Sequence, residues 1–222
     1  MNKWRLFAPP EDWHNPIEFD ESSLPVLTAA GKQLGLRMGR DDLQQKFFLG
    51  LPKASRPDSS GSGEGVKYPS GLSIPKAVLS EAEAARYGTT GIYTAAPLLA
   101  ARPDDRLSQS FRASEFMCHD ASFKFLRVSP ELVRRLEIIR KDLGEVPITV
   151  HSGYRPPAYN RAVPGAEPNS THIDGLAADI SAAGVPIETL RNVCEAVIGD
   201  AGGLGYYETF CHVDVRGYRS RW

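Results

Sequence analysis

The stretch Asn169-Ser-Thr-His-Ile-Asp-Gly-Leu-Ala-Ala-Asp179 places a histidine and an aspartate seven positions apart, with a glycine and small residues between them. A neutral imidazole and a carboxylate are both good ligands for a divalent ion, and zinc accepts this mixture of nitrogen and oxygen. Residues 176–180 read as a short strand, in which successive side chains point to opposite faces. A catalytic zinc site needs a third protein ligand and keeps a fourth position for water. His172 and Asp179 are therefore candidate ligands that need a third partner.

The third candidate lies in Phe210-Cys-His-Val-Asp-Val215, which also reads as a strand. Alternation makes one face of this strand apolar, whereas the other face carries His212 and Asp214. The pattern predicts one zinc ion per chain, bound by His172, Asp179 and His212. The alternative is that these are three unrelated polar residues in loops and turns.

Four blocks of sequence, taken in this order, resemble the zinc D-alanyl-D-alanine carboxypeptidase family. They are Ser152-Gly-Tyr-Arg155, the Ser-x-His-x-x-Gly-x-Ala-x-Asp pattern of residues 170–179, Gly203-Leu-Gly-Tyr-Tyr207 and His212-Val-Asp214. That family includes dipeptidases, phage endolysins and murein endopeptidases of the hedgehog/DD-peptidase fold. The subgroup with Gly-Tyr-Tyr and His-Val-Asp elements and a basic, tryptophan-ending tail is most similar. The resemblance covers about residues 107–222 and implies zinc-dependent hydrolysis of an amide bond in the stem peptides of bacterial peptidoglycan.

Arg155 is a candidate catalytic residue. It follows an expected strand over residues 146–151 and precedes two prolines, which stiffen the backbone behind it. Arginine suits the binding of a carboxylate, or of an oxyanion that develops during attack. The resemblance implies such a role, and a salt bridge without catalytic function is the alternative.

The general base is the point at which the sequence departs from the better-known family pattern. Many members place an acid three residues before the last histidine, a position that Thr209 occupies here. In a regular strand Glu208 and Asp214 would share the face of His212, so either acid could take a proton from zinc-bound water. We favour Asp214 as the base, because it belongs to the His-Val-Asp element. Its alternative role is to orient a zinc-bound imidazole.

Three residues are candidates for substrate binding. Ser170 would lie at the rim of the site, or would cap a turn. Tyr207 and its neighbour Tyr206 could line the cleft or pack in the core, and alternation suggests one of each. The resemblance adds Tyr154, from the Ser-Gly-Tyr-Arg block.

The expected fold class is α+β, with a small antiparallel sheet, flanking helices and an N-terminal extension. Ser129 as N-cap, Pro130 at the first position and an apolar stripe predict a helix that ends before Gly144. Residues 185–198 predict a second amphipathic helix.

Residues 1–106 are expected to be an N-terminal extension or small accessory region of unknown role, followed by a zinc peptidase domain over residues 107–222. Residues 52–65 are composed like a flexible linker. Three segments have the composition of short helices, at residues 24–34, 41–48 and 76–87. The extension could contact the wall or a partner, or could pack on the catalytic domain.

Composition narrows the classes of function. A formal net charge of −1 gives no bulk attraction to nucleic acid. No apolar run reaches the roughly 18 residues of a transmembrane helix. The glycine-rich stretch 202–207 lacks the Lys-Ser/Thr ending of a phosphate-binding loop. The cysteines are odd in number and lack metal-binding spacing, so free, mostly buried thiols are expected at Cys118, Cys194 and Cys211.

The first ten residues lack the apolar core and cleavage site of a secretory signal. We therefore expect synthesis in the cytoplasm and action on the wall after lysis or specialised secretion. The sequence leaves the scissile bond open among terminal D-Ala-D-Ala, a cross-link to diaminopimelate and L-Ala-D-Glu. It also leaves open a zinc-stabilised binding module, and a structural or delivery protein that carries a peptidase-like domain.

Overall fold

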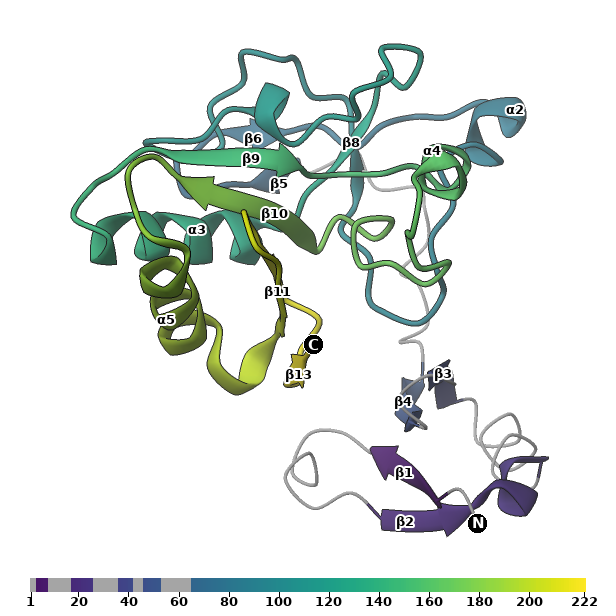
Figure 1. The fold of residues 1–222 in the computed structure, drawn as a ribbon. Helices are drawn as coiled ribbons and strands as arrows, with labels where there is room; N and C mark the ends of the chain where they lie inside the picture. Colours follow the sequence, from purple (N-terminus) through teal and green to yellow (C-terminus); the bar gives the residue numbers. More distant parts are fainter. Residues whose placement is uncertain (1–2, 8–16, 26–35, 42–45, 53–64) are drawn as a thin grey trace. The chain divides into compact units, whose positions relative to one another are not determined.

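The structure, a computed structural model, describes residues 3–7, 17–25, 36–41, 46–52 and 65–222. The chain divides into two compact units, Met1–Ser62 and Gly63–Trp222. In the first unit a short 3-10 helix, η1 (Glu21–Ser23), follows the second strand. The strands of this unit form a sheet in the order β2-β1-β4-β3, with bounds β1 (Lys3–Phe7), β2 (Ile17–Asp20), β3 (Leu36–Asp41) and β4 (Lys46–Pro52) (Figure 1).

The helix predicted over residues 41–48 is wrong. Asp41 ends β3 and Lys46 begins β4, and these two residues are paired in an antiparallel register. The run Lys46-Phe-Phe-Leu that opens β4 favours a strand, because aromatic side chains fit a pleated surface. Most of the candidate helix at 24–34 and of the linker at 52–65 lies outside the described residues.

The second unit is built on a sheet in the order β13-β11-β12-β10-β9. Its neighbouring strands are antiparallel, apart from the parallel pair β11 and β13. The strand bounds are β9 (Ile148–Ser152), β10 (Ala177–Ala182), β11 (Gly203–Tyr206), β12 (Cys211–Asp214) and β13 (Ser220–Arg221). The predicted mixture of helices with a small, mainly antiparallel sheet is confirmed.

Two helices pack beside this sheet (Figure 1). Helix α5 (Ile187–Ile198) contacts β10, β11 and β12, and α3 (Pro130–Asp142) packs on α5. The apolar stripe of α3 is fully buried and joins the core, through Leu132, Val133, Leu136 and Ile139. Pro130 opens α3, and Gly144 follows its end at a φ of 77°, which a residue without Cβ adopts at little cost.

The boundary between the units differs from the predicted one at residue 107. Residues 65–106 belong to the second unit, because their apolar side chains enter the same core as the helices and sheet. Buried members of this segment are Tyr68, Ile74, Tyr87, Leu98 and Leu99. Its strands are two-residue pairs, β5 (Val66–Lys67) with β6 (Ser73–Ile74), and β7 (Leu98–Leu99) with β8 (Leu126–Arg127).

Short elements complete the second unit. The candidate helix at 76–87 contains one helical turn, α2 (Glu81–Ala84), which the Ser80 side chain caps. A 3-10 turn, η2 (Ala113–Glu115), precedes β8, and another, η3 (Gly199–Ala201), follows α5. Helix α4 (Pro157–Ala162) lies after β9.

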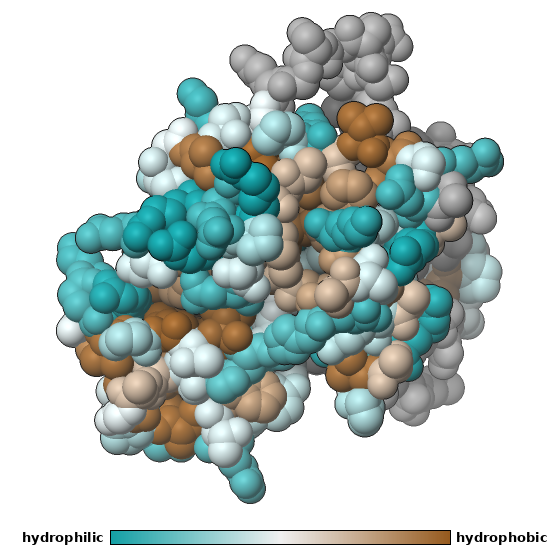
Figure 2. Space-filling view, turned by 90° about the horizontal axis from the view of Figure 1, so that it is seen from above, coloured by the Kyte–Doolittle hydropathy of each residue, from teal (hydrophilic) through white to brown (hydrophobic). Residues whose placement is uncertain are grey.

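Surface and cysteine predictions can be compared with the described residues. In that part of the chain no helix has the length and apolarity needed to cross a bilayer. The face seen in Figure 2 carries apolar residues in separate groups with hydrophilic residues between them. The three cysteines are free and buried, as predicted.

Candidate metal centre

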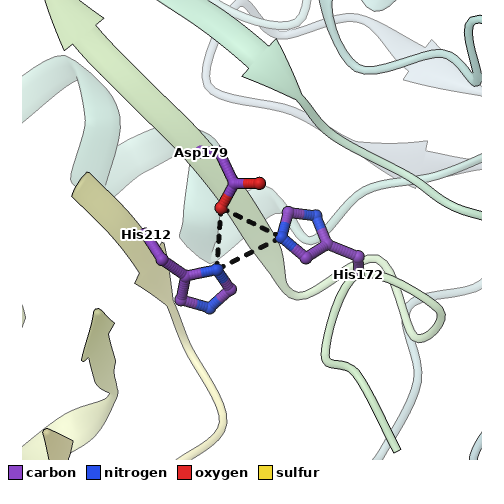
Figure 3. A group of neighbouring side chains, drawn as sticks. All are labelled: His172, Asp179 and His212. Carbon is purple, nitrogen blue, oxygen red and sulfur yellow. Dashed lines mark hydrogen bonds and ion pairs between the residues drawn. The ribbon is translucent and has the colours of Figure 1, made fainter. Parts of the chain in front are cut away.

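The three predicted ligands lie together, with Asp179 on β10, His212 on β12 and His172 on the loop before β10 (Figure 3). The Nε2 atom of His172 is 3.2 Å from Asp179 Oδ1 and 3.2 Å from His212 Nδ1. The third distance, from His212 Nδ1 to Asp179 Oδ1, is 2.9 Å. These atoms form a compact group that could hold a metal ion. The structure therefore brings together residues that are up to 40 positions apart in the chain.

Sheet register accounts for two of the three positions. Asp179 on β10 is the direct cross-strand partner of His212 on β12, so their side chains leave the same face. His172 comes from the loop before β10, which turns back at Gly175 with a φ of 68°. A Cβ on Gly175 would lie 2.5 Å from the Cβ of Arg127, so this turn requires glycine on two grounds.

Hydrogen bonds on the outer edges of both imidazoles determine which nitrogens face the cluster. His172 Nδ1 lies 2.7 Å from the carbonyl oxygen of Gly153, which can only accept, so Nδ1 carries the proton. His212 Nε2 donates to Asp214 Oδ2 over 3.1 Å. In the neutral imidazoles this leaves His172 Nε2 and His212 Nδ1 as lone-pair donors that face the Asp179 carboxylate. Such an arrangement is repulsive unless a cation lies between the three groups.

Burial and mutual electrostatics shift the pKa values of the three clustered residues in different directions. Burial alone would raise the pKa of Asp179, but the His172 and His212 imidazoles hold it well below its usual value. Burial lowers the pKa of His172. Burial also disfavours charge on His212, but the carboxylates of Asp179 and Asp214 outweigh it and raise the pKa of His212. The cluster therefore attracts positive charge, either a proton or a metal ion.

The spacing of the donor atoms fits a zinc ion. A tetrahedral zinc with bonds of about 2.0–2.1 Å has ligand atoms about 3.3–3.4 Å apart. The observed separations of 2.9–3.2 Å need only a slight expansion to reach that value. Two imidazole nitrogens and one carboxylate oxygen form a donor set typical of catalytic zinc, with a fourth position left for water.

Arg155 lies beside the cluster. Its Nη2 atom is 3.9 Å from Asp179 Oδ2, and its side chain is 13% exposed. Its backbone N–H donates to the carbonyl of His172. Among the described atoms the buried Nε of Arg155 has no hydrogen-bond partner. Burial lowers the pKa of Arg155, yet a guanidinium stays charged, so a hydrogen-bond donor remains available next to the three ligands.

The prediction that Asp214 removes a proton from metal-bound water is not supported by its position. Asp214 is fully buried and contacts the Nε2 edge of His212, whereas the Nδ1 edge faces the cluster. Its Oδ1 accepts from the backbone N–H of Gly203, and Arg216 donates to both of its oxygens. Burial would raise the pKa of Asp214, but the Arg216 guanidinium and the His212 imidazole hold it well below its usual value.

Glu208 does not lie on a strand. Strand β12 begins at Cys211, and Glu208 is an exposed residue of the turn that joins β11 to β12. Strand alternation therefore does not place Glu208 on the face of His212.

The substrate-binding predictions have different outcomes. Tyr154 is 1% exposed and packs in the core, a position that does not favour the predicted contact with substrate. Tyr206 and Tyr207 are 38% and 42% exposed, so neither packs in the core. Tyr207 stacks on Phe210 with ring centroids 4.3 Å apart. The Ser170 hydroxyl accepts from the backbone N–H of His172, which is its turn-capping alternative.

Gly153 supports the cluster through its backbone, a role that was not predicted from the sequence. Its carbonyl orients His172, and a Cβ there would lie 2.5 Å from the Cα of Phe116. The sequence feature that could have indicated this role is the Ser-Gly-Tyr-Arg block, which contains Gly153.

Gly153→Ala is expected to lower the free energy of unfolding by about 1–3 kcal/mol and to weaken zinc binding, because the backbone must shift away from Phe116. Gly88→Ala is the matched control, since its Cβ would meet Pro157 at an ordinary 3.6 Å. Urea unfolding and chelator competition measure the two effects. Equal stability and zinc affinity in both variants would contradict this account of Gly153.

Comparison with known proteins points to one class. Residues 107–214 match the family model described as Peptidase M15. The matched region contains His172, Asp179, His212 and Arg155, which form or adjoin the cluster. The match supports a peptidase of the M15 family.

A particular relative carries a more specific name. Over 97 residues the chain is 36% identical to the probable peptidoglycan L,D-endopeptidase MepK of Haemophilus influenzae. The aligned part is 40% of this chain and 51% of that protein, so the chain spans about half the length of this relative. The similarity supports a peptidase that acts on peptidoglycan.

Proposed function

We propose that this chain is a zinc-dependent peptidase that hydrolyses an amide bond in the stem peptides of bacterial peptidoglycan. The observation that carries the proposal is the convergence of His172 Nε2, Asp179 Oδ1 and His212 Nδ1, whose lone pairs need a cation between them. The match to Peptidase M15 and the name of the relative support the reaction and the substrate class.

When bound, zinc would polarise the scissile carbonyl and lower the pKa of a water molecule. Residues of this chain would prepare the site for that chemistry. The Gly153 carbonyl and the Asp214 carboxylate orient the two imidazoles. Arg155 offers its buried guanidinium to a substrate carboxylate, or to the oxygen that gains charge during attack.

We assign the proton transfer to Glu208, the other acid that the sequence analysis proposed. Glu208 lies in an exposed turn, so its carboxylate is open to solvent. Asp214 is instead held on both oxygens by protein donors. Ser170 and Tyr207 remain our candidates for substrate contact, because Tyr207 is exposed and Ser170 adjoins His172.

For the scissile bond we propose an internal L,D amide, which would make the chain an endopeptidase rather than a carboxypeptidase. The name of the Haemophilus relative is the support for this choice. Mass spectrometry of muropeptides after digestion of purified peptidoglycan tests it. Fragments produced by cleavage of an internal L,D amide are expected. Release of free terminal D-alanine alone would contradict endopeptidase activity.

A further inference from the structure

Arg216 is connected to His212 of the candidate metal site through the carboxylate of Asp214. Its Nε lies 2.9 Å from both oxygens of Asp214, and its Nη2 lies 2.5 Å from Oδ2. Its backbone N–H also donates to Asp214 Oδ1 over 3.0 Å. The side chain of Arg216 is only 10% exposed, and that of Asp214 is fully buried. This ion pair is therefore largely shielded from water, where charged hydrogen bonds hold their geometry firmly.

Three aromatic rings surround the guanidinium of Arg216. Its Cζ lies 5.7 Å from the ring centroid of Tyr93, 5.6 Å from that of Tyr218 and 5.1 Å from that of Trp222. We call Tyr93, Tyr218 and Trp222 the aromatic cage. Arg216 and all three cage residues lie outside the region 107–214 that matches the family model. The cage is thus a feature of this chain that the family match does not cover.

A planar guanidinium suits this position better than an ammonium. It can stack against aromatic faces and, through its edge, bind both oxygens of one carboxylate. The space is also tight, because a Cβ on Gly203 would lie 2.4 Å from Asp214 Oδ2 and 2.8 Å from Arg216 Nε. Rotation of the Asp214 carboxylate is therefore restricted on several sides.

We propose that Arg216 is a positioning residue for the metal centre. It fixes the Asp214 carboxylate so that Oδ2 accepts the Nε2 proton of His212, which leaves His212 Nδ1 free to bind the metal. The aromatic cage holds the guanidinium in the plane that this bond requires. The role in metal binding rests on the proposed zinc function, whereas the effect on the His212 tautomer does not.

The test compares Arg216→Gln and Arg216→Lys with the wild-type chain. Arg216→Gln is expected to weaken zinc affinity in chelator competition by up to about 10–100-fold, the effect of losing the direct partner of a metal ligand, because Asp214 would no longer be held against His212. In metal-free protein in alkaline buffer, nitrogen NMR is expected to show His212 protonated at Nε2 in the wild type and a mixture of tautomers in Arg216→Gln. Arg216→Lys keeps the positive charge but not the planar guanidinium that binds both carboxylate oxygens. It should lose less zinc affinity than Arg216→Gln.

Arg219→Gln is the matched control, because Arg219 lies on the same segment but is half exposed and pairs with Glu195. Its zinc affinity and His212 tautomer should equal those of the wild type. Wild-type affinity together with an unchanged tautomer in Arg216→Gln would overturn the proposal. If Arg216→Gln does not fold, full wild-type affinity in Arg216→Lys would overturn it. A wild-type chain that binds zinc but cleaves nothing would contradict the proposed function and leave the role of Arg216 intact.

Discussion

The chain with both His172→Ala and His212→Ala is expected to bind no zinc and to lose hydrolysis of peptidoglycan peptides. Each substitution removes one of the lone-pair donors, and a single carboxylate cannot hold the ion. Elemental analysis should find about one zinc per wild-type chain and none in the double variant.

His151→Ala is the control for the loss of a histidine. His151 is exposed and bonds to the Ser181 hydroxyl over 2.7 Å, and it is not a member of the His172, Asp179 and His212 cluster. This variant should keep its zinc and its activity. Full zinc retention in the double variant would show that the metal binds elsewhere.

Substitution of the two candidate acids, Glu208 and Asp214, is expected to have large but different effects on turnover and zinc affinity. Glu208→Gln should lower turnover by about 10²–10⁴-fold with zinc content near normal, because it removes the proposed proton carrier and no ligand. Asp214→Asn should instead weaken zinc affinity by about 10–100-fold, and added zinc should restore much of the rate. Steady-state kinetics at low and saturating zinc separate the two outcomes.

The reverse result would change the assignment. If Asp214→Asn abolished turnover at normal zinc content while Glu208→Gln left the rate intact, Asp214 would be the general base. Its contacts with Arg216 and His212 would then have to loosen when substrate binds.

The cluster of His172, Asp179 and His212 was predictable because its sequence signals are local. His172 and Asp179 lie in one glycine-containing loop and strand, and strand alternation in residues 210–215 singled out His212. The sequence did not reveal that Asp179 and His212 are direct cross-strand partners, since the register depends on how β10 and β12 pair.

The role of Asp214 could not be read from alternation. Alternation places Asp214 on the face of His212, but a ring has two edges, and the structure puts Asp214 on the outer one. The partner that explains this, Arg216, has no motif of its own. The burial of Tyr154 could not be read from its motif either, because its neighbour Arg155 adjoins the site whereas Tyr154 packs in the core.

The sequence also did not predict that the second unit includes residues 65–106. Strands β5, β6 and β7 are two residues long and show no period. Tyr93 lies in this segment, yet it contributes to the aromatic cage around Arg216. From the sequence such a segment reads as an extension, because its contacts are made with residues far away in the chain and leave no local pattern.

Digestion of purified peptidoglycan before and after metal removal tests the central claim most directly. The wild-type chain is expected to release new muropeptides, to stop when a chelator removes its metal, and to recover when zinc is added back. Cleavage that continues undiminished in the chelator, or a zinc-loaded chain that releases no fragment, would contradict the account of this chain as a zinc peptidase.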